Sequence, residues 1–266
     1  MLMPGFGELS EFARVGLAMV FVVVAGVVSR WQHADLEKDL FWATVRSFVQ
    51  LIAIGYVLEL VFAQKNPLWT LLILGVMLAT AARTTARRAA HMPGAQTIAL
   101  TSIGIGSALT LGVLLGLGVF RFTPQDVIPI GGMIIGNAMT TAALVMTRLS
   151  GDLINERDLI EAMLALSATG RQASLRQFRA ALRSAMLPII DTTKTVGLIK
   201  LPGAMTGMIL AGATPLEAIR LQLIVMYMLV GANTFTGIIA AYLTYRQFFS
   251  ADHRLELPEN VQIASS

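Results

Sequence analysis

Long apolar runs recur along this chain, and they limit its fold more than any other feature of the sequence. A run of about 20 apolar residues forms a helix long enough to cross a hydrocarbon core about 30 Å thick. Charged residues occupy only 14% of the 266 positions, whereas soluble domains carry about 25%. The sequence therefore predicts an all-α polytopic membrane protein and excludes a soluble globular enzyme.

We expect about seven transmembrane helices in a single permease-like domain, residues 1–266. They cover roughly 12–30, 39–62, 67–82, 95–119, 127–148, 188–211 and 217–245. The first is interpreted as an uncleaved span, because no basic segment precedes it and no small-residue cleavage site follows it. The sixth has the weakest apolar pattern, since it holds Asp191, Lys194, Lys200 and two prolines.

Basic residues are concentrated in the loops on one side of these spans. Thirteen of the 20 Lys and Arg fall in 30–38, 83–94, 148–187 and the tail after 245, and three fall on the other side. Because cytoplasmic loops carry the excess of Lys and Arg, this split predicts an outside N-terminus and a cytoplasmic C-terminus. The same rule explains the basic pI of about 9.8 without a nucleic-acid partner.

Glycines spaced four apart are expected to let helices approach closely in lipid. The pairs are Gly112/Gly116, Gly132/Gly136 and Gly203/Gly207. The alternative is that glycines near Pro129 and Pro202 break helices beside a substrate path. The chain has no cysteine and three histidines, His33, His91 and His253, which leaves few residues for a thiolate or imidazole metal site.

The polar stretch 149–187 predicts two helices on the cytoplasmic side. The first opens at 155–158 and ends at Gly170, with Leu159, Met163 and Leu166 on one face. The second ends at Leu187-Pro188 and carries a basic stripe beside an apolar stripe; these are Arg176, Arg179 and Arg183, and Leu175, Phe178, Leu182 and Met186. A helix of this kind lies on a membrane surface or in the groove of a partner.

The order Glu161-Ala162, then Leu187-Pro188, resembles the cytoplasmic "EAA" loop of ATP-binding-cassette (ABC) permeases. The chain departs from that pattern at Ser167, where the loop has Gly, and in a spacing about eight residues longer. In such permeases the short helix of the loop docks into a cleft of a separate ATPase subunit. The resemblance thus implies contacts to an ATPase from Glu161, Ala162, Met163, Ser167 and Arg171.

A second resemblance covers nearly the whole chain. The segment from Ala185 to Arg220 and the block Pro129-Ile-Gly-Gly-Met-Ile-Ile-Gly-Asn-Ala-Met139 are similar to the FetB (YbbM) family of bacterial permeases. This resemblance implies the inner-membrane subunit of an ABC exporter linked to iron export and peroxide resistance. Plant relatives of the family are tied to aluminium tolerance and UDP-glucose transport.

The chain contains no Gly-Lys pair and therefore no phosphate-binding P-loop. We expect ATP and Mg to bind a separate ATPase, present in two copies with two copies of this chain, and no cofactor in the chain itself. An intramembrane enzyme is disfavoured, because such enzymes need a Ser–His pair or two aspartates within the spans. An ion-coupled secondary transporter with Asp191 as its carrier is the other alternative.

Polar groups inside the spans are the candidates for a substrate path, because ionisable residues at membrane depth cost about 2.5–3.5 kcal/mol each. We select Asn137, Thr140, Asp191, Thr192, Lys194, Thr195 and Asn233. Asp191 and Lys194 are placed near the cytoplasmic mouth, where they are also able to neutralise each other. The amide and hydroxyl oxygens suit hard cations, but nothing in the residues selects iron over another cation, a chelate or a nucleotide sugar.

Overall fold

A computed structural model describes residues 11–33, 35–63, 66–90, 92–199, 201–250, 252 and 254–256. Within these residues every element is a helix, apart from an isolated antiparallel bridge between Phe249 and Leu255. The chain forms two compact units that divide between positions 64 and 65. The all-α prediction is confirmed for the described residues.

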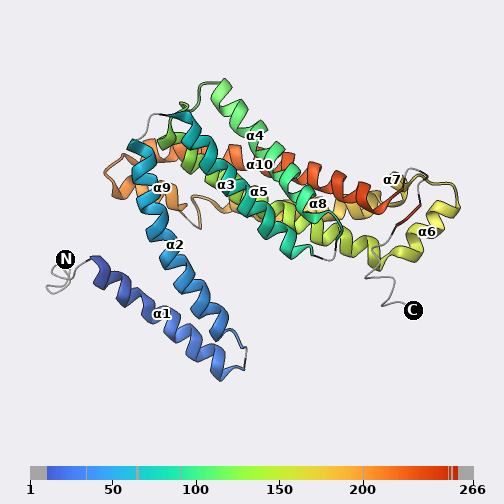
Figure 1. The fold of residues 1–266 in the computed structure, drawn as a ribbon, viewed down its shortest axis with the longest axis horizontal. Helices are drawn as coiled ribbons and strands as arrows, with labels where there is room; N and C mark the ends of the chain where they lie inside the picture. Colours follow the sequence, from blue (N-terminus) through green and yellow to red (C-terminus); the bar gives the residue numbers. More distant parts are fainter. Residues whose placement is uncertain are drawn as a thin grey trace. The chain divides into compact units, whose positions relative to one another are not determined.

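The first unit is a hairpin of two apolar helices, α1 (Glu11–Trp31) and α2 (Glu37–Ala63) (Figure 1). In the connection, the Leu36 N–H donates to Ser29 Oγ at 3.0 Å, and His33 and Asp35 have left-handed φ values of 53°. Large apolar side chains on both helices are exposed, among them Phe21 and Leu51. Apolar helices that expose such side chains are suited to lipid.

The second unit is a helical bundle built around α5 (Pro124–Asn155) and α10 (Pro215–Phe248). These two helices run side by side, and α3 (Pro67–Arg88), α4 (Ala95–Gly116) and α8 (Leu175–Thr195) pack against them (Figure 1). The short α6 (Arg157–Ala165) and α7 (Gly170–Ala173) lie at one end of the bundle, and α9 (Gly203–Leu210) contacts α10.

Local sequence explains where three of the long helices begin. α3, α5 and α10 each start with proline at the first helical position, preceded by Asn66, Thr123 and Thr214, respectively. The side chain of each capping residue accepts a hydrogen bond from a backbone N–H of the first turn. Such caps satisfy amides that the helix itself leaves unpaired, and proline has no such amide to satisfy.

Five described helices are long and apolar enough to cross a membrane: α2, α3, α4, α5 and α10. They coincide with five of the predicted spans, and the chain is a multi-pass membrane protein. α1 occupies the predicted first span, where its apolar part, Gly16–Trp31, is shorter than these five.

The sixth predicted span, 188–211, is not a single helix. α8 passes through Pro188 and ends at Thr195, the chain turns with Gly197 at φ 82°, and α9 begins only at Gly203. The prediction that the amphipathic helix ends at Leu187-Pro188 is therefore wrong. A helix tolerates an internal proline by giving up one hydrogen bond, and here packing against α5 and α10 holds both halves of α8 in line.

Helices α8 and α9 together return along the whole of α10. Gly170, just before α8, lies against the ring of Phe249, just after α10, whereas α9 leads directly into the first turn of α10. α5 has 32 residues and α10 has 34, which at 1.5 Å per residue gives about 48 and 51 Å. Both exceed a hydrocarbon core of about 30 Å, so part of each helix extends beyond it.

Two loops predicted from charge are in fact partly helical. α3 continues to Arg88, so the arginines assigned to a loop at 83–94 lie on its last turns, and α5 continues to Asn155 into the stretch predicted to be polar loop. Hydropathy marks where a helix leaves the apolar core, and not where its hydrogen bonding ends.

Close helix contacts use other glycines than the predicted pairs. A Cβ on Gly106 of α4 would lie 2.1 Å from Thr236 Oγ1 of α10, and one on Gly237 would lie 2.9 Å from Leu182 of α8. Among described residues, nothing lies within 4 Å of a Cβ built on most members of the predicted pairs, namely Gly112, Gly116, Gly136, Gly203 and Gly207. The spacing of small residues identifies faces that permit close approach, but the tertiary fold decides which faces meet.

Candidate functional site

The first candidate region is the α6–α8 end of the bundle, comprising α6, α7, the first half of α8 (residues 175–187) and residues 249, 250, 252 and 254–256. Glu156, just before α6, accepts hydrogen bonds from the side chains of Arg176 and Gln177 on α8. Gln177 is buried, whereas Arg176 is exposed. This link holds the start of α6 against α8.

α6 is held to the bundle by a different face from the predicted one. Ile160 is fully buried, and Met163 and Leu164 pack against the same core. Leu159 and Leu166, expected on the apolar face, are 47% and 84% exposed. The prediction was wrong because periodicity alone did not distinguish Ile160, which the end of α5 covers, from its apolar neighbours.

The turn after α6 also differs from the prediction. α6 ends at Ala165, Ser167 just after it has a left-handed φ of 68°, and Gly170 begins α7 instead of ending α6. Thr169 caps α7 reciprocally with Gln172. Gly170 is buried against Phe249, where a Cβ would lie 2.6 Å from Cδ1 of the ring. Position 167 is the one at which the resembling permease loop has glycine, the residue that adopts a positive φ without strain.

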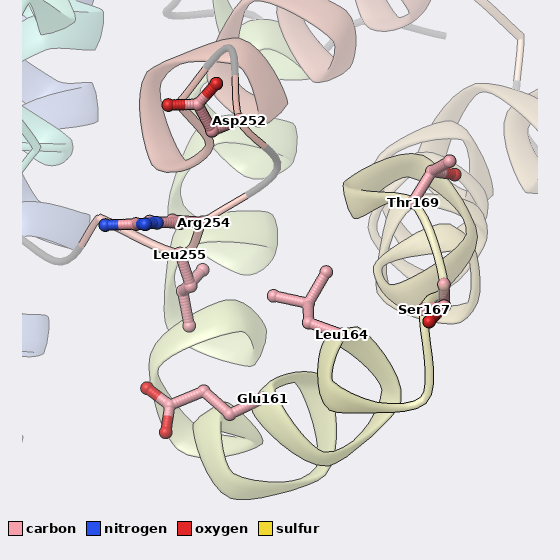
Figure 2. Close-up of a pocket in the computed structure, with 8 residues that line it drawn as sticks. Glu161, Leu164, Ser167, Thr169, Asp252, Arg254 and Leu255 are labelled. Atoms are coloured by element: carbon pink, nitrogen blue, oxygen red, sulfur yellow. The ribbon is translucent and has the colours of Figure 1, made fainter.

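A pocket of about 500 Å³ opens between α6 and the C-terminal segment. Its lining comprises Glu161, Leu164, Ser167, Ala168, Thr169, Asp252, Arg254 and Leu255. Leu164 and Leu255 point toward each other, whereas Glu161 points away from them (Figure 2). The carboxylate of Glu161 accepts a 2.7 Å hydrogen bond from Arg157 Nε, and both side chains are exposed.

The structure brings together only part of the predicted coupling set. Glu161 and Ser167 line this pocket, Ala162 is exposed beside it, and Met163 is half-buried. Arg171 instead lines a smaller pocket with Tyr242 and Tyr245 of α10. Sequence reasoning missed Asp252, Arg254 and Leu255, which carry no motif. Leu255 forms the antiparallel bridge with Phe249.

The second candidate region is a cavity of about 250 Å³ between α5, α8 and α10, named here the central cavity. It is lined by Asn137, Thr140, Thr141, Ala185, Pro188, Ile189, Thr192, Met226, Leu229 and Asn233. Four predicted path residues thus meet from three helices: Asn137, Thr140, Thr192 and Asn233. Met226 and Leu229 were missed, although they lie seven and four residues before Asn233 and therefore share its helix face.

Polar groups of the central cavity are only partly paired. Asn137 Nδ2 donates to the Met133 carbonyl oxygen at 2.9 Å, and Thr140 Oγ1 donates to the Gly136 carbonyl oxygen at 3.3 Å. Asn233 is 3% exposed, and its Oδ1 has no hydrogen-bond partner among the described residues. Buried polar atoms are rarely left in that state without a functional reason or a bound water or ion.

Three other predicted path residues do not line the cavity. Asp191 and Lys194 have exposed side chains and form no ion pair with each other among the described residues, and Thr195 Oγ1 donates to the Asp191 carbonyl oxygen at 2.8 Å. Thr192 lines the cavity together with Asn137, which is at the midpoint of the predicted fifth span. The placement of Asp191 and Lys194 near the cytoplasmic mouth stays a prediction.

Within the described residues, no group of three or more His, Cys, Asp or Glu side chains is arranged to hold a metal ion. His91 and His253 lie outside the described residues.

Comparison with known proteins assigns the family. The model of the family described as "Uncharacterised protein family (UPF0014)" matches residues 12–249. The chain is 45% identical over 254 residues to the UPF0014 membrane protein STAR2 of Oryza sativa subsp. japonica, covering 95% of this chain and 89% of that one. It is 44% identical over 248 residues to the Arabidopsis thaliana protein ALUMINUM SENSITIVE 3, covering 93% and 91%.

The name of one bacterial relative describes a transport protein. The chain is 40% identical over 241 residues to the probable iron export permease protein FetB of Escherichia coli (strain K12), covering 91% of this chain and 93% of that one. No solved structure matches the chain.

Proposed function

Because the chain belongs to the UPF0014 family, we propose that it is the permease subunit of an ABC transporter that exports iron. It lies in the bacterial inner membrane and is driven by a separate ATPase. The observation that carries the proposal is the exposed α6 helix beside the 500 Å³ pocket, which presents the Glu161-Ala162 motif at one end of the bundle. The name of the Escherichia coli relative supports iron as the substrate.

The α6–α8 end is the docking surface for the ATPase. Its contacts come from Glu161, Ala162, Met163, Ser167 and Arg171, and the pocket adds Asp252 and Arg254. Both charge signs are present there, so a partner surface of mixed charge is able to pair with it. ATP and Mg bind to the partner, two copies of which pair with two copies of this chain.

This assignment places the α6–α8 end in the cytoplasm. The arginines of α8 and of the last turns of α3 then follow the positive-inside rule. The sixth crossing is made by the broken pair α8 and α9, and the N-terminus lies outside. Discontinuous helices of this kind are common beside the substrate sites of transporters.

α8 provides the mechanical connection between docking surface and cavity. Its first turn is tied to Glu156 at the start of α6, while its second half supplies Pro188 and Thr192 to the central cavity. A displacement of α6 by the closing ATPases therefore moves one wall of the cavity. Alternating access follows if that movement opens the cavity toward one side of the membrane and closes it toward the other.

Transport into inside-out vesicles tests the proposal directly. Vesicles that hold the chain and its ATPase should accumulate radioactive iron only with ATP, and Glu161→Arg should abolish the uptake and release the ATPase on co-purification. The double variant Arg157→Glu/Glu161→Arg is the matched control, because it restores the ion pair within α6 but not the surface charge. If the double variant restores uptake, Glu161 serves only the helix and the docking role is wrong.

Failure to take up iron, in a complex with ATPase activity, would contradict iron and leave the permease role. Nucleotide sugars are then the next substrates to test. Iron uptake that follows an ion gradient without an ATPase would instead show a secondary transporter.

A further inference from the structure

A smaller pocket than the two described above lies at the α6–α8 end, where α7 and the start of α8 meet the last turns of α10 (Figure 1); it is named here the tyrosine pocket. Its volume is about 110 Å³. It is lined by Arg171, Ser174, Leu175, Phe178, Tyr242 and Tyr245. Pockets for drug-sized ligands start at about 300 Å³, so the tyrosine pocket suits one charged or polar group of a larger molecule.

The positive charge at the tyrosine pocket has no acidic partner in the described part of the chain. Arg171 lines the pocket, and the Cζ atom of Arg246 lies 6.0 Å from the centroid of the Tyr242 ring. None of the ion pairs among the described residues includes either arginine, whereas Arg157 and Arg176 at the same end are each paired with a glutamate. The pocket lining contains no Asp or Glu. Two cations beside one tyrosine therefore favour a ligand with negative charge.

The length of α10 places this pocket at the level of the lipid headgroups. In the proposed topology α10 starts at the outer surface, and the rise from Pro215 to Tyr242 is about 40 Å. A bilayer including its headgroup regions is about 40–45 Å thick. Tyrosine is enriched at this level, because its ring is apolar and its hydroxyl is polar. Tyr242 is 50% exposed, so a headgroup in the cytoplasmic leaflet is able to reach it.

The chemistry of the lining selects a phospholipid over other anions. A phosphodiester has oxygens that accept hydrogen bonds from a guanidinium group, and the pairing is strong because both groups are charged. Leu175 and Phe178 give the pocket an apolar wall, and Leu175 is 37% exposed. Such a wall offers nothing to a soluble phosphate, whereas the acyl chains of a lipid bury apolar surface against it. Cytoplasmic leaflets also carry the anionic lipids that attract clustered Lys and Arg.

We infer that the tyrosine pocket binds the headgroup of an anionic phospholipid of the cytoplasmic leaflet, with its phosphate on Arg171 and Arg246. The start of its acyl chains lies on Leu175 and Phe178. This goes beyond the proposed function and takes from it only the side of the membrane. Arg171 also belongs to the proposed docking surface, and the pocket places it beside α10. A bound lipid therefore ties α7, at the docking surface, to the long α10 helix.

Native mass spectrometry of the full chain in neutral detergent, titrated with phosphatidylglycerol, tests the inference. Phosphatidylcholine is the comparison lipid, because it has the same phosphate but a choline cation that cancels its charge. The double variant Arg171→Gln/Arg246→Gln should weaken phosphatidylglycerol binding by about 25-fold, since each arginine near an anionic surface contributes about fivefold. The matched control Arg148→Gln/Arg157→Gln removes as many charges from arginines that are already paired with acids, and it should change binding by about twofold or less.

Four results would overturn the inference: equal binding of the two lipids, equal binding by the double variant and the wild type, an equal loss in the matched control, or displacement of phosphatidylglycerol by excess inorganic phosphate, which would make free phosphate the ligand. A double variant that keeps the lipid but releases the ATPase on co-purification would show that the two arginines bind an acidic protein surface instead.

The lipid titration needs no ATPase, and this keeps the two proposals apart. ATP-driven iron uptake by a chain that does not distinguish the two lipids refutes the lipid site and retains the exporter. Selective binding of phosphatidylglycerol without iron uptake refutes the exporter and retains the lipid site.

Discussion

The α6–α8 end and the central cavity differ in their exposure and in the charge of their residues. The first is exposed, carries both charge signs and has the Glu156–Arg176 and Arg157–Glu161 ion pairs on its surface. The second lies between three helices, has no charged lining residue and includes Asn233, whose Oδ1 has no hydrogen-bond partner among the described residues. Exposed ion pairs are worth little, with a median of about 0–1 kcal/mol. These ion pairs thus add little stability to the α6–α8 end, which is held to the bundle by buried Ile160 and by the contact of Gly170 with Phe249.

The largest effect is expected where α4 and α10 pack closely against each other. Gly106→Val should destabilise the protein by about 3 kcal/mol, because the new side chain meets Thr236 Oγ1 at 2.1 Å and the Thr236 backbone nitrogen at 3.0 Å. Gly112→Val on the same helix has open space and should change stability by about 0.5 kcal/mol or less. Denaturation in mixed micelles measures both, and equal losses would show that α4 and α10 do not cross closely at Gly106.

The next largest loss of stability is expected at the α6–α8 end, where Gly170 contacts the ring of Phe249. Gly170→Ala should cost about 2 kcal/mol locally, because its Cβ meets the Phe249 ring at 2.6 Å. We expect faster proteolysis of the C-terminal segment, with the bundle intact. Phe249→Leu in the same chain should recover much of the loss. A double variant as sensitive as the single one would mean that this contact does not hold the segment.

A stability change of the opposite sign is expected in the cavity. Asn233→Leu should raise stability by about 1 kcal/mol, since replacing an unsatisfied buried polar group by an apolar one of similar size removes its desolvation penalty. Thermal unfolding of the solubilised chain measures the change, and a destabilised Asn233→Leu would show instead that the amide holds the helices together.

The smallest effect concerns the turn after α6. Ser167→Gly should stabilise the protein by about 0.5–1 kcal/mol, because serine there has a φ of 68° that glycine adopts without strain. Thermal unfolding of the solubilised chain measures it, and Ala168→Gly provides the control at a neighbouring position. A loss of stability in Ser167→Gly would mean that the hydroxyl makes a contact more valuable than the strain it introduces.

Much of the fold follows from hydropathy, because each long helix must bury its own backbone polar groups in lipid. Five predicted spans are long apolar helices, and proline with a capping residue marks three of their starts. The helix end predicted at Leu187-Pro188 is wrong, because Pro188 is a local signal and contacts with α5 and α10 keep α8 helical through it. Gly106 and Gly237 were missed since nothing local separates them from the open glycines.

The candidate sites also combine features that the sequence predicts with features that only the tertiary structure decides. Sequence order indicated Glu161, and polar residues at membrane depth indicated Asn137 and Asn233, because residue type and approximate depth are properties of the sequence itself. The sequence did not reveal that Asp252, Arg254 and Leu255 line the pocket beside α6, or that Asp191 and Lys194 lie off the cavity while Thr192 lines it. The rotation of each helix about its axis decides these placements, and that rotation is set by which neighbours each helix packs against, a property of the tertiary structure alone.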